Sequence, residues 1–472
     1  MPKSIRLSSG FILLIITLVG AMIAILPPPA GVDPKAFPIF GIFIAVILGV
    51  LLQPYPMVVV TLIGFFACLI FKLIPASEGF ACFGQSVVWL VVFASIAAKS
   101  FVKTNLGHRT ACFFIQKMGH SSLSLAYGIT FGELILSPMI PSNTARASCV
   151  TVPLTVSISE SLGSFATNHT EGVVGRFLSL CSVHANQLTC AVFLTSVASN
   201  PICQNFMADI GIHVSWIEWF IIASVPGLLC LFAMPWIMYK LSPPQLTKIA
   251  NAGEIAQKQL STMPPMSKKE YITMFVFIGM LTCWIFGDVI HVPTGVVALG
   301  GLCALLATNV LDAEDLTGAK DIWSICIWLS ILNVMALKLT EFGLIQHYSL
   351  VLRGSVSGMA WPLALCVVSV TYYFARYLVP GNVLHACAMF PPFAQLLIAC
   401  GVPAKLGCMT LGIITAYCGF VTPYGSSSCP LYFNTGYIDQ RLWWRIGFIT
   451  TLIYFAIWGI FGGIWWKILG YW

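Results

Sequence analysis

Long apolar runs recur along almost the whole chain and constrain its fold more than any other feature of the sequence. With 58% hydrophobic and only 8% charged residues among 472, little sequence remains for a folded soluble domain. The 39 glycines and 27 prolines argue against β-barrel strands. We expect an all-α polytopic membrane protein with about 11 transmembrane helices, some interrupted, at these runs: 11–26, 37–52, 56–74, 84–101, 176–198, 217–238, 271–291, 294–310, 322–340, 406–421 and 445–464.

Two further apolar regions, 121–160 and 358–399, are broken in the middle. The first break contains Pro138 and Pro141, and the second is the Pro-Gly-Asn sequence at 380–382. Each arm has about 16–18 residues, which is too short for an upright span of roughly 20. We therefore predict two re-entrant helical hairpins whose tips lie inside the membrane.

The two halves of the chain repeat the same landmarks. Three pairs are separated by 239 residues, as in 381 − 142 = 239: Trp89 and Trp328, Ser142 and Gly381, Arg146 and His385. The polar stretch between the halves, Lys240 to Lys269, is Lys-rich, so we place it in the cytoplasm together with the N-terminus. Six crossings then precede this stretch and five follow it, which predicts an external C-terminus. Inverted repeats with broken helices are typical of secondary transporters.

The hairpin tips contain the first candidate binding residues. Ser142, Asn143 and Thr144 follow the first break, where a serine or asparagine can cap the returning helix. Free backbone N–H groups at such a helix start attract anions. A simple turn and cap is the alternative interpretation. Because Gly381 and Asn382 occupy the same place in the second hairpin, we favour a binding role for both tips.

A basic residue follows each tip within one helical turn. A cation there is disfavoured by the helix dipole, by about 0.3–1 kcal/mol, and by burial in the membrane. Arg146 and His385 therefore predict a compensating anion. Two alternatives remain open: Arg146 could form an ion pair with Glu133 or Glu160, and His385 could be a neutral, hydrogen-bonded core residue.

A second pair of breaks follows two other helices, at 195–201 and 421–428. Both contain small and hydroxyl residues and a proline, which suits unwound backbone that lends carbonyl and N–H groups to a ligand. Asn200, Thr422 and Pro423 are therefore further substrate-binding candidates. Ordinary loops have this composition too.

Other functional classes find little support. The chain has no H-E-x-x-H, G-x-x-x-x-G-K-[ST] or G-x-G-x-x-G motif, so we expect no enzyme and no catalytic residues. Its basic residues are scattered, so we expect no nucleic-acid partner. A channel is disfavoured because broken hairpins in both halves suit alternating access better than a fixed filter.

Several of these motifs resemble the divalent anion/sodium symporter superfamily. They are the tip at 141–146, the run from Phe193 to Asn200, the segment from Thr422 through Tyr437, and the ending at 465–467. The resemblance is greatest to the branch of citrate, tartrate/succinate and 2-oxoglutarate/malate carriers. It implies a homodimeric elevator transporter in which paired Ser-Asn-Thr signatures bind substrate carboxylates and contribute to sodium sites.

By motif position, that binding role falls on Ser142, Asn143, Thr144 and Asn382. In a sodium-coupled member, Ser142, Asn143 and Asn382 would also be metal ligands. This sequence departs from the family pattern at the second tip, where Gly381 and Val383 replace the expected Ser and Thr. That change removes two hydroxyl ligands.

These observations predict exchange of small dicarboxylates such as succinate, malate, 2-oxoglutarate or tartrate, without a cofactor. Sodium-coupled di- or tricarboxylate (citrate) symport, with Na⁺ as the coupling ion, is the alternative. We expect a homodimer in the lipid bilayer of the cell's inner (plasma) membrane. The predicted parts are 1–118 (first helix and scaffold of repeat 1), 119–239 (transport part of repeat 1), 240–270 (linker), 271–357 (scaffold of repeat 2) and 358–472 (transport part of repeat 2).

Overall fold

The computed structural model describes residues 8–118, 120–249, 261, 263–356 and 359–472. Helices are the main regular structure in this part of the chain, and within it the only β pairing is an isolated antiparallel bridge between Ser121 and Lys248. The all-α prediction is therefore confirmed. Most of the predicted linker, including Lys258, lies outside the described residues.

Each predicted apolar run overlaps a helix, and the ends of run and helix differ by at most seven residues, as at the last run (464 − 457 = 7). The helices are α1 (Ser9–Ala24), α2 (Ala36–Leu52), α3 (Met57–Ile70), α5 (Ser86–Lys103), α10 (Gly175–Val192), α12 (Trp216–Leu241), α14 (Lys268–Ile285), α16 (Thr294–Ala307), α18 (Lys320–Glu341), α22 (Ala404–Tyr417) and α24 (Gln440–Ile457). Among the described residues, six helical stretches are long and apolar enough to cross a membrane.

Both predicted hairpins are helical arms interrupted at the tip. In the first, α7 (Ser122–Leu136) is followed by a returning arm that comprises α8 (Asn143–Arg146), a π-helical turn (Ala147–Thr151) and α9 (Val152–Ser161). In the second, α20 (Trp361–Phe374) and the 3₁₀ turn η4 (Ala375–Tyr377) precede the returning helix α21 (Asn382–Ala399).

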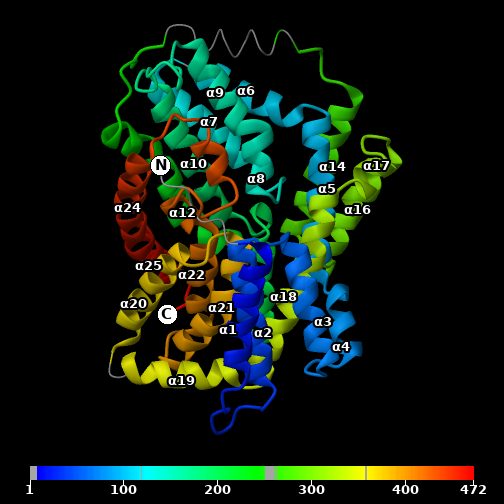
Figure 1. Cartoon of the computed structure of the whole chain (residues 1–472). Coiled ribbons are helices and arrows are strands. Elements are labelled where there is room, and N and C mark those ends of the chain that lie inside the picture. The colour runs from blue at the N-terminus through cyan, green and yellow to red at the C-terminus, as the bar shows by residue number, and fades with distance from the viewer. Residues whose placement is uncertain (1–7, 119, 250–260, 262, 357–358) are drawn as a thin grey trace.

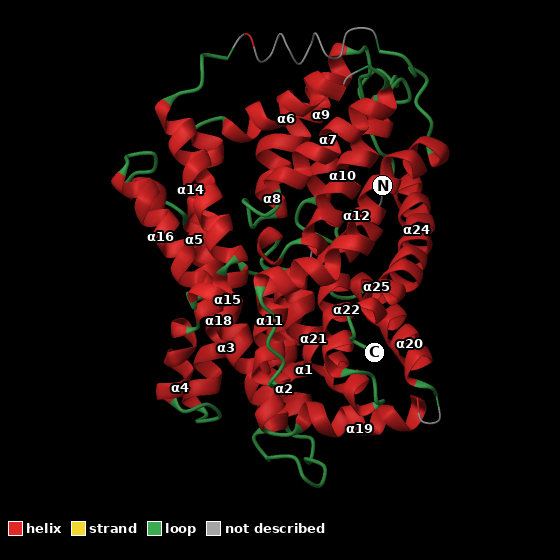
Figure 2. Ribbon diagram, turned by 180° about the vertical axis from the view of Figure 1, so that it is seen from behind, coloured by secondary structure: helices red, strands yellow, loops and turns green. Residues whose placement is uncertain are grey.

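The helices form two groups that lie side by side (Figures 1 and 2). One group contains α3, α5, α14, α16 and α18, and the other contains both hairpins with α10, α12, α22 and α24. We call them the flanking group and the hairpin group. The remaining short helices are α4 (Ala76–Ala81), α11 (Ser199–Asp209), α15 (Gly287–Ile290), α17 (Ala313–Thr317), α23 (Cys429–Phe433) and α25 (Gly463–Ile468).

Two amphipathic helices that the apolar runs did not reveal connect these groups. They are α6 (Leu106–Met118), between α5 and α7, and α19 (Leu344–Val356), between α18 and α20. They lie across opposite ends of the molecule (Figure 1). Arg109 fixes α6 to α14 because its Nε donates to Glu270 Oε1 at 2.7 Å. The order of elements thus repeats, and the opposite positions of α6 and α19 agree with the predicted inversion.

The long helix α12 contains two prolines, and a tryptophan from the C-terminal end of the chain repairs one interruption. Pro226 has no N–H to donate to the carbonyl of Ile222, four residues earlier. Trp466 on α25 supplies the missing donor, since its Nε1 lies 3.0 Å from that carbonyl oxygen. The ending of the chain is therefore bound to the hairpin group by a specific hydrogen bond as well as by packing.

Candidate functional site

The first tip begins with a capped helix start. Pro138 and Pro141 fall where α7 ends, and Ser142 takes an extended conformation with φ −140°. The Ser142 Oγ accepts a hydrogen bond from the backbone N–H of Ala145 at 3.2 Å. The N–H groups at the first positions of a helix have no intrahelical acceptor, so the tip retains donors for a ligand.

Arg146 lies directly behind this tip and is paired with an acid. Its Nε donates to Glu133 Oε1 at 2.7 Å, and the two side chains are 0% and 1% exposed. Its Nη1 donates to the carbonyls of Ile140 and Ser196, at 2.6 and 2.7 Å. The ion pair with Glu133, one of the two alternatives, is therefore present. Through Ser196, Arg146 joins the tip to the first unwound segment, the break between α10 and α11. Arg146 and Glu133 together carry no net charge.

The side chain of Asn143 reaches the second half of the chain. Its Nδ2 donates to Ser426 Oγ at 2.9 Å and lies 3.3 Å from Ser428 Oγ. Asn186 on α10 donates to the Asn143 carbonyl at 3.1 Å, and Gln187 donates to Ser428 Oγ at 2.7 Å. Ser426 and Ser428 belong to the second unwound segment, Cys418 to Ser428, so this segment is bound to the first tip.

The second tip contacts the same unwound segment and the end of α22 that precedes it. The Gly381 N–H donates to the carbonyl of Gly425 at 3.0 Å, and Asn382 Nδ2 donates to the carbonyl of Ala416 at 3.2 Å. Gly381 has φ +88°, a left-handed conformation that serine rarely adopts. The backbone conformation at this position favours glycine over the serine of the Ser-Asn-Thr pattern. Asn143 and Asn382 are both 5% exposed.

The segment from Cys418 to Ser428, between α22 and α23, connects the two tips. Three buried oxygens around it have no hydrogen-bond partner: Gln187 Oε1, Asn382 Oδ1 and Thr422 Oγ1. The segment packs tightly, because a Cβ at Gly419 would lie 2.4 Å from Gln187 Oε1. Such oxygens could act as ligands for a hard cation or, in the case of the Thr422 hydroxyl, donate to a carboxylate. Pro423 follows Thr422 in this segment and is partly exposed.

Asn200 was expected on unwound backbone but lies in the first turn of α11, where it has a local structural role. Its Nδ2 donates to the carbonyls of Cys190 and Phe193, at 2.7 and 2.9 Å. These carbonyls end α10, so the amide satisfies groups that the interruption leaves open. Thr195 Oγ1 also donates to the carbonyl of Pro138 at 2.8 Å, which ties the first unwound segment to the first hairpin.

His385 occupies the repeat position of Arg146, but no acid among the described residues pairs with it. It is fully buried, its Nε2 lies 3.1 Å from the carbonyl oxygen of Tyr372, and the two rings are 4.4 Å apart. Tyr372 is 239 residues after Glu133 (372 − 133 = 239). The second repeat therefore replaces the ion pair with a hydrogen-bonded aromatic pair, as the alternative interpretation of His385 expected.

The sequence reasoning missed Arg376, which lies in the 3₁₀ turn before the second tip. It is 0% exposed, its Nη2 donates to the carbonyl of Thr415 at 2.7 Å, and its Nε lies 3.0 Å from Cys418 Sγ. Its Nη1 has no partner, and no ion pair joins Arg376 to an acid within the described residues. An ionisable residue inside an apolar arm was the available signal.

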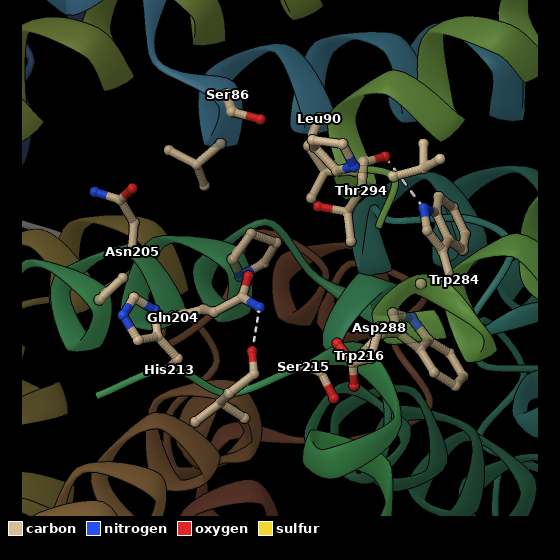
Figure 3. A pocket seen from close by; sticks show the side chains of 17 residues that line it. Ser86, Leu90, Gln204, Asn205, His213, Ser215, Trp216, Trp284, Asp288 and Thr294 are labelled. Carbon is tan, nitrogen blue, oxygen red and sulfur yellow. Dashed lines mark hydrogen bonds between the residues drawn. The ribbon is translucent and has the colours of Figure 1, made fainter. Parts of the chain in front are cut away.

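A cavity of about 350 Å³ opens between the two helix groups (Figure 3). Trp216 and Trp284 line it, together with polar side chains that include Gln204, His213 and Asp288. None of the predicted tip residues line this cavity. The convergence of the two tips and a buried arginine, rather than cavity size, therefore locates the candidate site.

Comparison with known proteins gives matches along the entire chain. The sequence model of a family described as the sodium:sulfate symporter transmembrane region matches residues 8–472. A candidate malate transporter of Bacillus subtilis is 37% identical over 98% of this chain and 96% of its own length. Dicarboxylate transporter 2 of spinach chloroplasts is 34% identical over 94% of this chain and 79% of its own length. The L-tartrate/succinate antiporter of Shigella flexneri is 28% identical over 95% and 96%.

A solved structure shares the fold. The YdaH transporter of Alcanivorax borkumensis superposes with a TM-score of 0.54 at 13% identity, over 98% of this chain and 97% of the other. At that identity the likeness concerns the architecture alone. The family match and the relatives confirm what the tip motifs predicted: the chain belongs to the sodium:sulfate symporter family of membrane transporters, within the divalent anion/sodium symporter superfamily.

Proposed function

We propose that this protein exchanges small dicarboxylates across a membrane. The observation that carries the proposal is the meeting of two hairpin tips on one unwound segment, from Cys418 to Ser428. Each tip offers the open N–H groups of a helix start, so a molecule with a carboxylate at each end matches the pair. The names of the relatives from Bacillus subtilis, spinach and Shigella flexneri support the same substrate class.

Exchange is favoured over sodium symport by the composition of the second tip. Gly381 and Val383 stand where the family pattern expects a serine and a threonine, so two hydroxyl ligands for sodium are missing. The left-handed backbone at Gly381 makes this loss part of the local fold. The Shigella flexneri relative is also named an antiporter.

Uptake of labelled succinate into proteoliposomes tests this proposal. Vesicles preloaded with unlabelled succinate should accumulate label rapidly, whereas vesicles without internal substrate should accumulate little. Competition by malate, 2-oxoglutarate, tartrate, citrate and sulfate in the same assay identifies the preferred acid. Strong sodium-stimulated accumulation in vesicles without internal substrate would overturn exchange.

Sodium-coupled symport is the second candidate, and the unpartnered oxygens of Gln187, Asn382 and Thr422 favour it. Oxygen atoms of this kind suit a hard cation. Succinate counterflow measured in sodium and in choline buffers separates the candidates. Equal rates support exchange, and a rate that requires sodium supports the symporter.

The proposed carrier works as a homodimer in the plasma (inner) membrane, with a cytoplasmic N-terminus. In an elevator mechanism, the hairpin group would move as the transport part, and the flanking group would remain as the scaffold. The division into parts at 118, 239, 270 and 357 stays a prediction. Crosslinking in native membranes would test the dimer.

A further inference from the structure

Arg376 places a buried positive charge beside the second tip. Its guanidinium and the Asn382 amide bind consecutive carbonyls at the end of α22, those of Thr415 and Ala416. Both side chains therefore lie at the same helical turn. The remaining nitrogen, Nη1, is buried and donates to no acceptor among the residues that the structure describes. A buried donor without an acceptor is rare in folded proteins and calls for an explanation.

The buried arginine at the first tip, unlike Arg376, has an acidic partner. There the charge of Arg146 is cancelled by Glu133 at 2.7 Å. The repeat position of Glu133 is Tyr372, and that of Arg376 is Ser137, which donates to the carbonyl of Thr189 at 3.1 Å. The second half thus has a tyrosine where the first has an acid, and an arginine where the first has a serine. Among the described residues, the two tips together carry one uncompensated positive charge.

We propose that Arg376 sets the charge of the substrate site and thereby makes exchange obligatory. This inference rests on the proposed function and names the residue responsible for it. The starts of the two returning helical arms each act like roughly half a positive charge, so with Arg376 they amount to about two. A dicarboxylate dianion balances that potential. Without substrate the charge of Arg376 is unbalanced, which opposes movement of the empty hairpin group through lipid.

The test compares three variants in two assays, exchange into preloaded vesicles and net uptake into vesicles without internal substrate. Arg376→Gln removes the charge, Arg376→Lys keeps it, and Cys418→Ser changes a hydrogen-bond partner of Arg376 without changing the charge. Arg376→Gln should raise the ratio of net uptake to exchange by at least about tenfold, because the empty site is then neutral. The other two variants should retain the low ratio of the parent.

A second measurement distinguishes a charge-setting residue from a structural one. Removing an uncompensated buried charge should leave the melting temperature of the empty protein in detergent unchanged or raised, and should reduce its increase on adding succinate. A merely structural arginine would give the opposite result. An Arg376→Gln protein that melts earlier or fails to fold, or that exchanges as strictly as the parent, overturns the inference.

The parent protein tests the proposed function separately. If the parent shows net uptake without internal substrate, exchange itself fails. If the parent exchanges strictly and Arg376→Gln does so too, only the role of Arg376 fails.

Discussion

Two buried arginines of this protein differ in one respect, the presence of an acid within reach. Arg146 has Glu133 at 2.7 Å, and Arg376 has only a carbonyl and a thiol. An intact buried ion pair adds little to the free energy of unfolding, but removal of one partner strongly destabilises the protein because the other charge stays buried and uncompensated. The two sites should therefore respond in opposite ways when one charge is removed.

Glu133→Gln should destabilise the protein by about 3–5 kcal/mol, because it leaves Arg146 charged, buried and without its acid. The double variant Glu133→Gln with Arg146→Gln should recover most of that loss. Unfolding in detergent, followed by tryptophan fluorescence, measures both. Equal losses in the single and the double variant would contradict the ion-pair assignment.

Asn143→Ala and Asn382→Ala should each reduce succinate counterflow by at least about tenfold, since each deletes a buried amide that joins a tip to its surroundings, to Ser426 on the unwound segment for Asn143 and to the end of α22 for Asn382. Expression and dimer formation should be unchanged. Asn168→Ala, on an exposed loop, is the control. If both tip variants transport like the parent, the site is wrongly placed.

The break and the helix cap at the first tip could be predicted from the sequence, whereas the tertiary partners of the tip residues could not; the binding role of these residues stays a prediction. Ser142 and Asn143 were accessible because a proline break followed by a capping residue is a local pattern. The choice of Glu133 for Arg146, and the contact from Asn143 to Ser426, depend on tertiary packing that local pattern does not contain. Arg376 was missed because its distinguishing feature is that no acid among the described residues pairs with it, and a local sequence pattern does not show which side chains pair in the fold.

At the scale of elements, interrupted helices are stabilised by donors from elsewhere in the chain. Trp466 Nε1 supplies the hydrogen bond that Pro226 cannot give to the Ile222 carbonyl. The long apolar helices were predictable because their composition alone requires them. The amphipathic α6 and α19 were not, because 13 residues of mixed polarity resemble a loop in a hydropathy profile.

Trp466→Phe should cost about 1 kcal/mol or more of stability, because it leaves the Ile222 carbonyl without a donor. In a Pro226→Ala background, the new N–H of residue 226 can satisfy that carbonyl, so the same change should cost less. A thermal-melt double-mutant cycle over the two positions gives the coupling. Additive losses would show that Trp466 acts by packing alone.

At the scale of the whole molecule, the two helix groups should differ in their response to substrate. Cys149, exposed on the π-helical turn behind the first tip, belongs to the hairpin group, whereas the exposed Cys303 on α16 belongs to the flanking group. Succinate should slow the reaction of Cys149 with a thiol reagent and leave that of Cys303 unchanged. Identical responses would argue against movement of one group relative to the other.

The orientation in the membrane is a separate prediction. Lys258, outside the described residues, should be cytoplasmic, and Trp472 should be external, because an odd number of crossings separates them. Cysteines placed at these two positions and labelled with an impermeant reagent decide the matter. Labelling of both from the same side would contradict the inverted repeat.

The helices α6 and α19 have a mechanical consequence. Each contains 13 residues, so each is a rod about 20 Å long that joins the flanking group to the hairpin group at opposite ends of the molecule. A helix resists stretching, so if the hairpin group moves as proposed, rotation at the ends of these rods would accommodate its displacement. Two rods of equal length at opposite ends of the molecule would then act as a parallelogram linkage, which would permit a sliding movement with little tilt and limit its reach to the arc that the rods describe.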